Sequence, residues 1–327
     1  MTSDERYRVR NRLAALGAVL LVALPAAAQE YPAKPVRIII GFSPGGATDL
    51  VARLMAPKYS SVLKQPFIVD NRPGANGVIG SDLAAKAAPD GYVIHLATIG
   101  SLVLSPATSK VPYDPLKDFA PISQAGALQN IFIVHPALPV QTLKDLVALA
   151  KARPGALNFA SSGTASPGHL AGELLKNMTG IKLVHVPYKG GGPAMIDLLA
   201  GHVEIFVAVI STAVPQVKAG KARALAVTGT KRAAALPDVP TVAETGLKGY
   251  EATNWYGYVA PAATPRAIIE RLHKATVAVL EMPDLKQALL DQGIEAAGST
   301  PEQFAAYIRS ETAKWTRVIR AAGIKVD

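Results

Sequence analysis

The sequence of 327 residues contains no cysteine. Disulfides are therefore excluded, and the chain must be stabilised by its hydrophobic core. Aromatic residues are also scarce, at 6% of the sequence, although hydrophobic residues of all kinds make up 50%. This composition, rich in Ala, Val, Leu and Gly, favours layered helices and strands over a β-sandwich. The length is sufficient for two such domains.

Basic residues are numerous, but they form no continuous run. The formal net charge is +10, and an excess of positive charge is one mark of nucleic-acid-binding proteins. The Lys and Arg residues of this chain are scattered and are not interleaved with aromatic residues, so we expect no nucleic-acid partner. A generally basic surface instead favours anionic small molecules. The six histidines are dispersed and never spaced four apart, so we expect no metal site.

The apolar run near the N-terminus is too short to span a membrane. The first twelve residues carry four arginines, and the apolar run Leu13–Leu24 follows. A membrane-spanning helix needs about 20 residues. Pro25 and the small residues Ala26–Ala28 then provide a cleavage site. This order predicts a secretory signal peptide over residues 1–28, rather than an ordinary N-terminal helix, and an exported mature chain that begins near Gln29.

The most informative segment is a strand followed by a glycine loop and a helix. The run Val36–Phe42 is typical of a parallel strand buried on both faces. Gly45 and Gly46 then allow a sharp turn and leave backbone N–H groups uncovered by side chains. Either Thr48 or Asp49 caps the helix that follows, and the N-terminus of a helix favours an anion. We interpret the loop as a cradle for a carboxylate or phosphate, in which Asp49 braces the loop, because a bare carboxylate would repel an anion.

A second polar loop lies between the expected strand Leu157–Ala160 and the expected helix Pro167–Met178. Four hydroxyl side chains surround Gly163 in this loop, and such a group is well suited to hydrogen-bonding an oxyanion. They are Ser161, Ser162, Thr164 and Ser166. His169, one turn into the helix, either donates to the ligand or supports the loop from behind.

Neither loop matches a nucleotide-binding motif. The pattern G-x-G-x-x-G is absent, and Lys189–Gly192 lacks the G-K-[ST] order of a P-loop. We expect that the segment Lys189–Gly192 instead braces a ligand cleft, or that Lys189 gives this cleft positive potential. We therefore expect no cofactor.

Strand-like and helix-like segments alternate along the chain, which predicts an α/β fold with mostly parallel sheets flanked by helices. The expected strands are Val36–Phe42, Pro66–Asp70, Tyr92–Thr98, Ile131–Val134, Leu157–Ala160, Lys182–Tyr188, Val203–Ile210, Ala222–Thr228 and Trp255–Ala260. This order fits two similar lobes joined by two crossing strands, with a ligand cleft between the lobes.

Several motifs carry a resemblance to a known family. They are Phe42–Asp49 (FSPGGATD), Asn71–Gly74 (NRPG), Pro89–Tyr92 (PDGY), Tyr113–Pro115 (YDP), Leu157–Gly172 (LNFASSGTASPGHLAG), His185–Pro193 (HVPYKGGGP), Leu236–Thr241 (LPDVPT) and Trp255–Pro265. By these motifs the whole mature chain resembles the Bug family, the periplasmic solute-binding receptors of tripartite tricarboxylate transporters.

The resemblance implies a two-lobed, type II periplasmic-binding-protein-like fold that closes on a small carboxylate. One lobe would comprise residues 29–127 and 252–327, and the other residues 128–251. The hinge strands would lie near residues 128–134 and 251–259. The implied partners are the carboxylate ligand and membrane permease subunits, and we expect a monomer.

The resemblance also implies the ligand-binding residues, which are backbone and hydroxyl donors of both lobes. In the first lobe they are Phe42, Ser43, Pro44, Gly45, Gly46, Ala47, Thr48, Asp49, Thr98 and Ser101. In the second lobe they are Ser161, Ser162, Thr164, Ser166 and His169.

One position departs from the family pattern. Where the family usually has Phe-Asp-Asn, this chain has Val207–Val209, with Ala208 in the place of the Asp. That Asp would face the pocket and pair with an amino group, which Ala208 cannot do. We therefore expect a di- or tricarboxylate or an aromatic acid without an amino group.

The alternative function is an exported serine hydrolase that acts on small esters. Ser162 lies at a strand-to-helix turn, and His169 is close in sequence. However, Ala160 stands where the nucleophile elbow G-x-S-x-G requires its first glycine, and no acid is placed to orient His169. The sequence therefore favours a binding protein over an enzyme.

Overall fold

The computed structural model describes residues 31–188 and 190–324. The predicted signal peptide and Lys189 lie outside the described residues. Along the described chain, no helix combines the length and the hydrophobicity that crossing a bilayer requires. Every element named below belongs to one compact unit, which begins at Lys34.

Within the described residues, ten strands pair in the order β2-β1-β3-β9-β4-β7-β5-β6, with β8 and β10 also paired to β4. They are β1 (Val36–Ile40), β2 (Phe67–Asn71), β3 (Val93–Thr98), β4 (Phe119–Val134), β5 (Asn158–Ser161), β6 (Val184–Pro187), β7 (Ile205–Val209), β8 (Arg223–Val227), β9 (Thr253–Pro261) and β10 (Ile294–Ala296). The predicted α/β class is confirmed.

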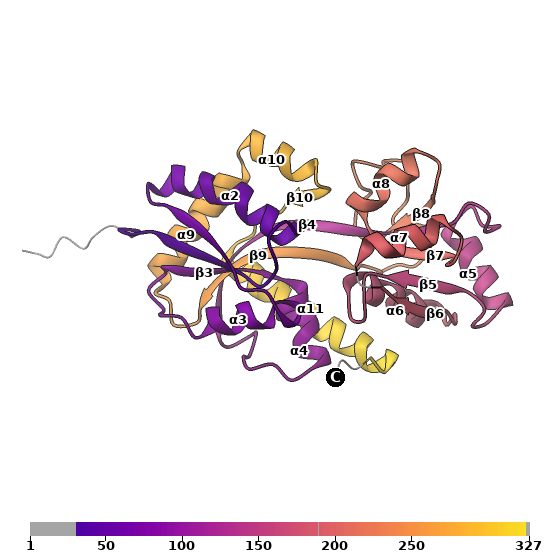
Figure 1. Cartoon of the computed structure of the whole chain (residues 1–327). Helices are drawn as coiled ribbons and strands as arrows, with labels where there is room; N and C mark the ends of the chain where they lie inside the picture. The colour runs from indigo at the N-terminus through magenta and orange to yellow at the C-terminus, as the bar shows by residue number, and fades with distance from the viewer. Residues whose placement is uncertain (1–30, 189, 325–327) are drawn as a thin grey trace, which may run out of the picture. The chain divides into compact units, whose positions relative to one another are not determined.

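Strand β4 is shared by two groups of strands (Figure 1). It has 16 residues. Its first part pairs antiparallel with β9 and β10, and its last part pairs antiparallel with β7 and β8. We call β1, β2, β3, β9 and β10 with their helices the first lobe, and β5, β6, β7 and β8 with theirs the second lobe.

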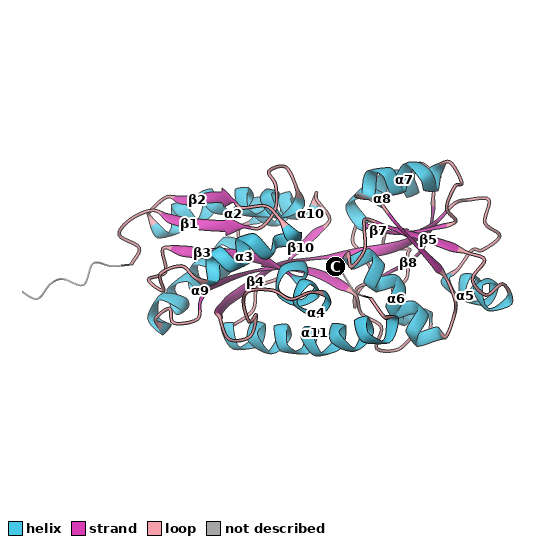
Figure 2. Cartoon of the chain, turned by 60° about the horizontal axis from the view of Figure 1, so that its bottom comes forward, coloured by secondary structure: helices cyan, strands magenta, loops and turns pink. Residues whose placement is uncertain are grey.

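Each lobe has three adjacent parallel strands. In the first lobe they are β2, β1 and β3, and in the second lobe they are β6, β5 and β7. Helices lie on both sides of the strands (Figure 2). Because both faces are covered, Ile38, Ile39 and Ile40 of β1 are almost fully buried, as the apolar run in the sequence predicts.

The helices connect these strands and cover them. They are α2 (Ala47–Leu63), α3 (Val78–Ala85), α4 (Ser105–Thr108), α5 (Leu143–Ala152), α6 (Pro167–Thr179), α7 (Gly191–Leu199), α8 (Ile210–Lys218), α9 (Arg266–Leu280), α10 (Pro283–Leu290) and α11 (Pro301–Ala322), with short turns η1 (Ala75–Gly77), η2 (Gly100–Leu104) and η3 (Ala243–Thr245). In the first lobe, α2 packs against α9 and α10, whereas α3 packs against β1 and β3. Strand β1 lies between β2 and β3, so the chain moves to one side of β1 and then returns to the other side. Because both crossovers are right-handed, they must lie on opposite faces of the sheet.

Two parts of the fold differ from the sequence prediction. The strand expected over Ile131–Val134 begins much earlier, at Phe119, and contains register shifts between Pro121 and Ser123 and between Gln124 and Gly126. Helices α4, α8 and α10 and strand β10 were not predicted. Pro215 lies inside α8, where a proline normally argues against a helix.

Candidate functional site

The first predicted loop joins the carboxyl end of β1 to α2. Gly45 has φ +82°, a left-handed conformation that favours glycine, and Gly46 is the N-cap of α2. No side chain caps this helix, so the prediction that Thr48 or Asp49 is its cap is wrong. The N–H groups of the first helical turn have no acceptor inside the helix and are directed out of its N-terminus. This end of α2 therefore offers backbone donors to an anion.

Asp49 braces the loop, as predicted. The residue is 4% exposed, and its carboxylate accepts a hydrogen bond from Gly45 N at 2.9 Å. Arg53 Nε contacts both carboxylate oxygens, at 3.0 and 2.9 Å, and Asn71 Nδ2 donates to Oδ1 at 2.9 Å. Burial would raise the pKa of Asp49, but the hydrogen bonds from Arg53, Gly45 and Asn71 outweigh it and lower the pKa. The carboxylate is thus ionised and matched by Arg53, so it does not make the loop repulsive to an anion.

The end of β1 is in backbone contact with the turn that follows β2. A Cβ atom added at Gly41 would lie 2.5 Å from Gly77 Cα, and one added at Gly80 would lie 2.7 Å from Gly41 Cα. Only glycine permits this approach. The close approach of Gly77 and Gly80 to Gly41 therefore helps to position the first loop.

Thr98 and Ser101, at the end of β3, lie below the surface. They are 6% and 1% exposed. Ser101 N donates to Thr98 Oγ1 at 3.2 Å, and Thr98 N donates to Ser101 Oγ at 3.2 Å. Their hydroxyl groups are thus used to form the turn that starts η2. Both residues are therefore buried, and their hydroxyl groups are engaged within this turn.

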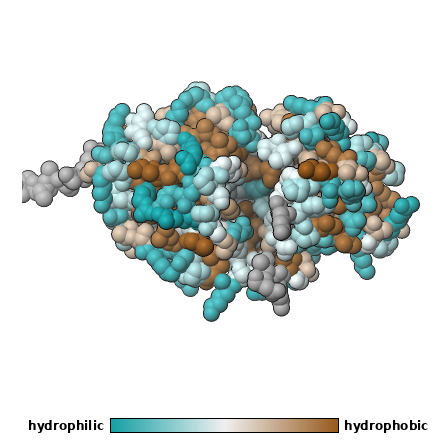
Figure 3. Space-filling view, in the orientation of Figure 1, coloured by the Kyte–Doolittle hydropathy of each residue, from teal (hydrophilic) through white to brown (hydrophobic). Residues whose placement is uncertain are grey.

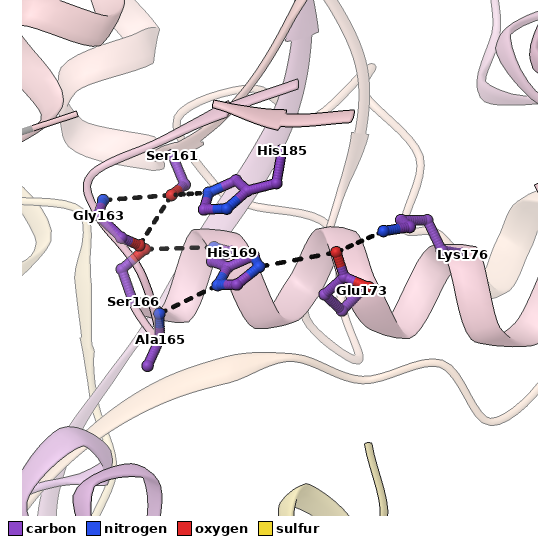
Figure 4. A network of polar contacts seen from close by, with 8 residues as sticks. All are labelled: Ser161, Gly163, Ala165, Ser166, His169, Glu173, Lys176 and His185. Carbon is purple, nitrogen blue, oxygen red and sulfur yellow. Dashed lines mark hydrogen bonds and ion pairs between the residues drawn. The ribbon is translucent and has the colours of Figure 1, made fainter. Parts of the chain in front are cut away.

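The second predicted loop joins β5 to α6 (Figure 4). Ser161 is fully buried, and its Oγ contacts Gly163 N at 3.2 Å, Gly163 O at 2.9 Å and His185 Nε2 at 2.7 Å. Ser166 is the N-cap of α6 and accepts from His169 N at 3.3 Å. Ser162 and Thr164 are more exposed, and among the described residues neither hydroxyl has a hydrogen-bond partner. These two hydroxyls are therefore the ones available to a ligand.

His169 supports this loop from behind. Its Nδ1 accepts a hydrogen bond from Ala165 N at 3.0 Å, so the ring proton is on Nε2, which lies 3.6 Å from Glu173 Oε1. The ring stacks on His185, with centroids 3.6 Å apart and planes inclined by 7°. Burial lowers the pKa of His185 to about 3. Of the two predicted roles of His169, this geometry favours the supporting one.

The same contacts argue against the hydrolase alternative. A serine nucleophile needs a free imidazole nitrogen as its base. Nδ1 of His169 is occupied by Ala165 N, and Nε2 is directed toward Glu173. Ser162 is therefore not paired with His169 as a nucleophile with its base.

The two loops line separate cavities between the lobes. The molecular surface is hollowed between the lobes (Figure 3). A cavity of about 310 Å³ lies between Gly45, Gly46 and Ala47 of the first lobe and Val209 and Ser211 of the second. A second cavity of about 580 Å³ lies between residues 162–167 of the second lobe and residues 75–78 and 105–111 of the first. Among the described residues, these two cavities share no lining residue.

Ala208 requires a correction. Its side chain is fully buried and packs with Ile131, Ala160 and Ala194 in the core of the second lobe. Because side chains alternate along β7, the neighbouring Val209 lines the cavity instead. The prediction that position 208 faces the ligand is wrong.

Comparisons with known proteins agree with this architecture. The sequence model described as tripartite tricarboxylate transporter family receptor matches residues 51–324. Protein BugT of Bordetella pertussis is 36% identical over 310 residues, which cover 93% of this chain and 94% of BugT.

Two solved structures from Rhodopseudomonas palustris are similar. Rpa4515, solved with adipate, is 35% identical with a TM-score of 0.77, and the match covers 90% of this chain and 99% of that one. MatC, solved with malate, is 29% identical with a TM-score of 0.73, and the match covers 88% of this chain and 100% of that one. The two-lobed α/β fold is that of periplasmic binding proteins, as predicted.

Proposed function

The chain belongs to the family of tripartite tricarboxylate transporter receptors, and from this we propose that it is a periplasmic receptor that captures a small carboxylate and delivers it to a membrane permease. Receptors of this kind bind their ligand and do not transform it. The predicted signal peptide supports a periplasmic location. Rpa4515 and MatC, solved with adipate and malate, support a carboxylate as the ligand class.

The observation that carries the proposal is the chemistry of the two loops. Each follows a parallel strand and ends at the N-terminus of a helix, α2 or α6. The first offers backbone N–H groups, and the second offers the hydroxyl groups of Ser162 and Thr164. Oriented donors of this kind bind a carboxylate by charge-assisted hydrogen bonds without needing a fixed cation.

The same cavities favour a ligand without an amino group. Among the described residues that line the larger cavity there is no Asp or Glu. In the smaller cavity, the carboxylate of Asp49 is already held by Arg53 and Asn71. An ammonium group would find no available counter-ion in either place, which replaces the argument from Ala208.

We further propose that the lobes close on the ligand. The lobe boundaries would be those given by the resemblance, residues 29–127 with 252–327 and residues 128–251. The hinge would then lie in β4 near Leu128 and in the segment that precedes β9. Closure would bring the two loops onto one ligand and present the closed surface to the permease, with the receptor acting as a monomer.

A thermal-shift screen of the mature protein tests the proposal. The protein would be freed of bound ligand by unfolding and refolding and then mixed with dicarboxylates, tricarboxylates, aromatic acids and amino acids. A ligand at 100 times its Kd stabilises the folded state by about 2.7 kcal/mol, which is readily measured. Stabilisation by a carboxylate without an amino group is the expected result. Preferential binding of aspartate or glutamate would contradict the ligand class, and hydrolysis of a chromogenic ester lost in Ser162→Ala would contradict the receptor function.

A further inference from the structure

The cavity of about 580 Å³ between the lobes is lined in part by polar residues and one basic residue. Its volume lies in the range of small-molecule sites. It carries hydroxyl and amide groups and one lysine, Lys110, but no acidic residue. A lining with that composition attracts anions.

Most of the first-lobe hydroxyl groups that line this cavity already form hydrogen bonds within the first lobe. Thr108 Oγ1 donates to Leu104 O at 2.8 Å, and Ser109 Oγ donates to Ser105 O at 3.0 Å. Ser105 Oγ accepts from Asn76 Nδ2 at 3.3 Å. The first lobe therefore contributes few free hydroxyl donors to a ligand here.

Lys110 is different. It is exposed, follows the short helix α4, and has no acidic partner within the part of the chain that the structure describes. By contrast, the nearby Lys117 lies 3.1 Å from Asp114 Oδ2. Among the described residues, the ammonium group of Lys110 thus has no acidic partner, and none of the described residues that line the cavity is acidic. The hydroxyl groups of Ser162 and Thr164 lie on the other lobe and line the same cavity.

We propose that Lys110 is a specificity-determining residue that selects dicarboxylates over monocarboxylates. One carboxylate of the ligand is held by the β5–α6 loop, and Lys110 pairs with the second carboxylate from the first lobe. The ligand then bridges the lobes, so the distal charge also favours closure. This inference rests on the proposed function, because it concerns the same ligand site.

The test compares two pairs of ligands matched in carbon number, adipate with hexanoate and malate with 2-hydroxybutyrate. Their affinities would be measured by isothermal titration calorimetry on the mature protein. Lys110→Met removes the charge and keeps the length of the side chain. We expect it to weaken binding of the preferred dicarboxylate by roughly tenfold, with less than a twofold change for the matched monocarboxylate. Lys110→Arg should retain the preference.

Lys117→Met is the matched control, because Lys117 is an exposed lysine of the same lobe that does not line the cavity. It should change neither affinity. Equal losses for both members of a pair in Lys110→Met would show a general field effect and overturn the inference, as would an unchanged dicarboxylate affinity. If the unmodified protein bound no carboxylate at all, the proposed function itself would fail, and the role of Lys110 with it.

Discussion

Acid should destabilise this protein through one buried histidine of the first lobe. His95 in β3 is 1% exposed. Its Nδ1 lies 2.9 Å from Ile39 O and therefore carries the proton, and its Nε2 lies 2.9 Å from Ser81 Oγ, from which it accepts. Burial lowers the pKa of His95 from 6.5 to about 4, although the hydrogen bond to Ile39 acts in the opposite direction. Between these two pKa values, His95 is thus neutral in the folded protein but protonated in the unfolded chain.

The sign and size of the effect follow from proton linkage. Because the folded-state pKa is below the unfolded one, the contribution of His95 to stability is complete above pH 6.5 and is lost as the pH falls toward 4. Between pH 6.5 and 5 the unfolded chain binds the proton and the folded protein largely does not. This gap of about 1.5 pH units corresponds to about 2 kcal/mol at 1.36 kcal/mol per unit.

Urea denaturation at pH 7.5 and pH 5 would measure this loss. In His95→Gln the drop in unfolding free energy between the two pH values should be smaller by about 2 kcal/mol than in the unmodified protein. Ser81→Ala is the control, because it removes a hydrogen bond of His95 but leaves the titrating ring in place. It should lower stability at both pH values and keep the pH dependence. Parallel curves for His95→Gln and the unmodified protein would refute the reasoning.

Three further predictions concern the loops and the N-terminus. Asp49→Ala removes the acceptor that holds Gly45 N, so carboxylate affinity measured by calorimetry should fall by roughly tenfold, and an unchanged Kd would show that the brace is not needed for binding. Ser166→Ala removes the cap of α6 and should lower the unfolding free energy by about 1 kcal/mol. Ser162→Ala should weaken carboxylate binding and change the unfolding free energy by less than about 0.5 kcal/mol. The reverse pattern would assign the capping role to Ser162 and the binding role to Ser166. Mass spectrometry of the exported protein should find Gln29 at its N-terminus, and an intact leader would contradict the signal peptide.

Local sequence patterns predicted those parts of the fold that depend on neighbouring residues. The strand, glycine loop and helix over Val36–Leu63 and the bracing role of Asp49 are local features, and the structure shows both. The first half of β4 was missed because its partner β9 is distant in sequence and because bulges near Pro121 and Gly126 interrupt its alternation. The pairing of two strands that are distant in sequence is therefore difficult to predict from the sequence of one strand alone.

The errors within the candidate site have a different cause. A shift of one residue along a strand moves a side chain to the opposite face, and this distinguishes the buried Ala208 from Val209, which lines the cavity. The support of His169 by His185 was also missed. The rings of the two histidines stack. The parallel pairing of β5 with β6, in which Phe159 lies opposite His185, brings His185 to this position. No local sequence pattern predicts that register.

The position of β9 determines the order in which the lobes can be completed. In chain order β9 follows the whole second lobe, yet it lies between β3 and β4 in the first. As the chain emerges from its N-terminus, the strands β1–β3 therefore have no link to β4 until β9 arrives, while β5–β8 can already pair around the end of β4. A chain truncated before Thr253 would leave the edges of β3 and β4 unpaired, and such edges promote aggregation. The lobe that begins first is completed last, so we expect a cell that makes this protein to depend on factors that protect the incomplete first lobe.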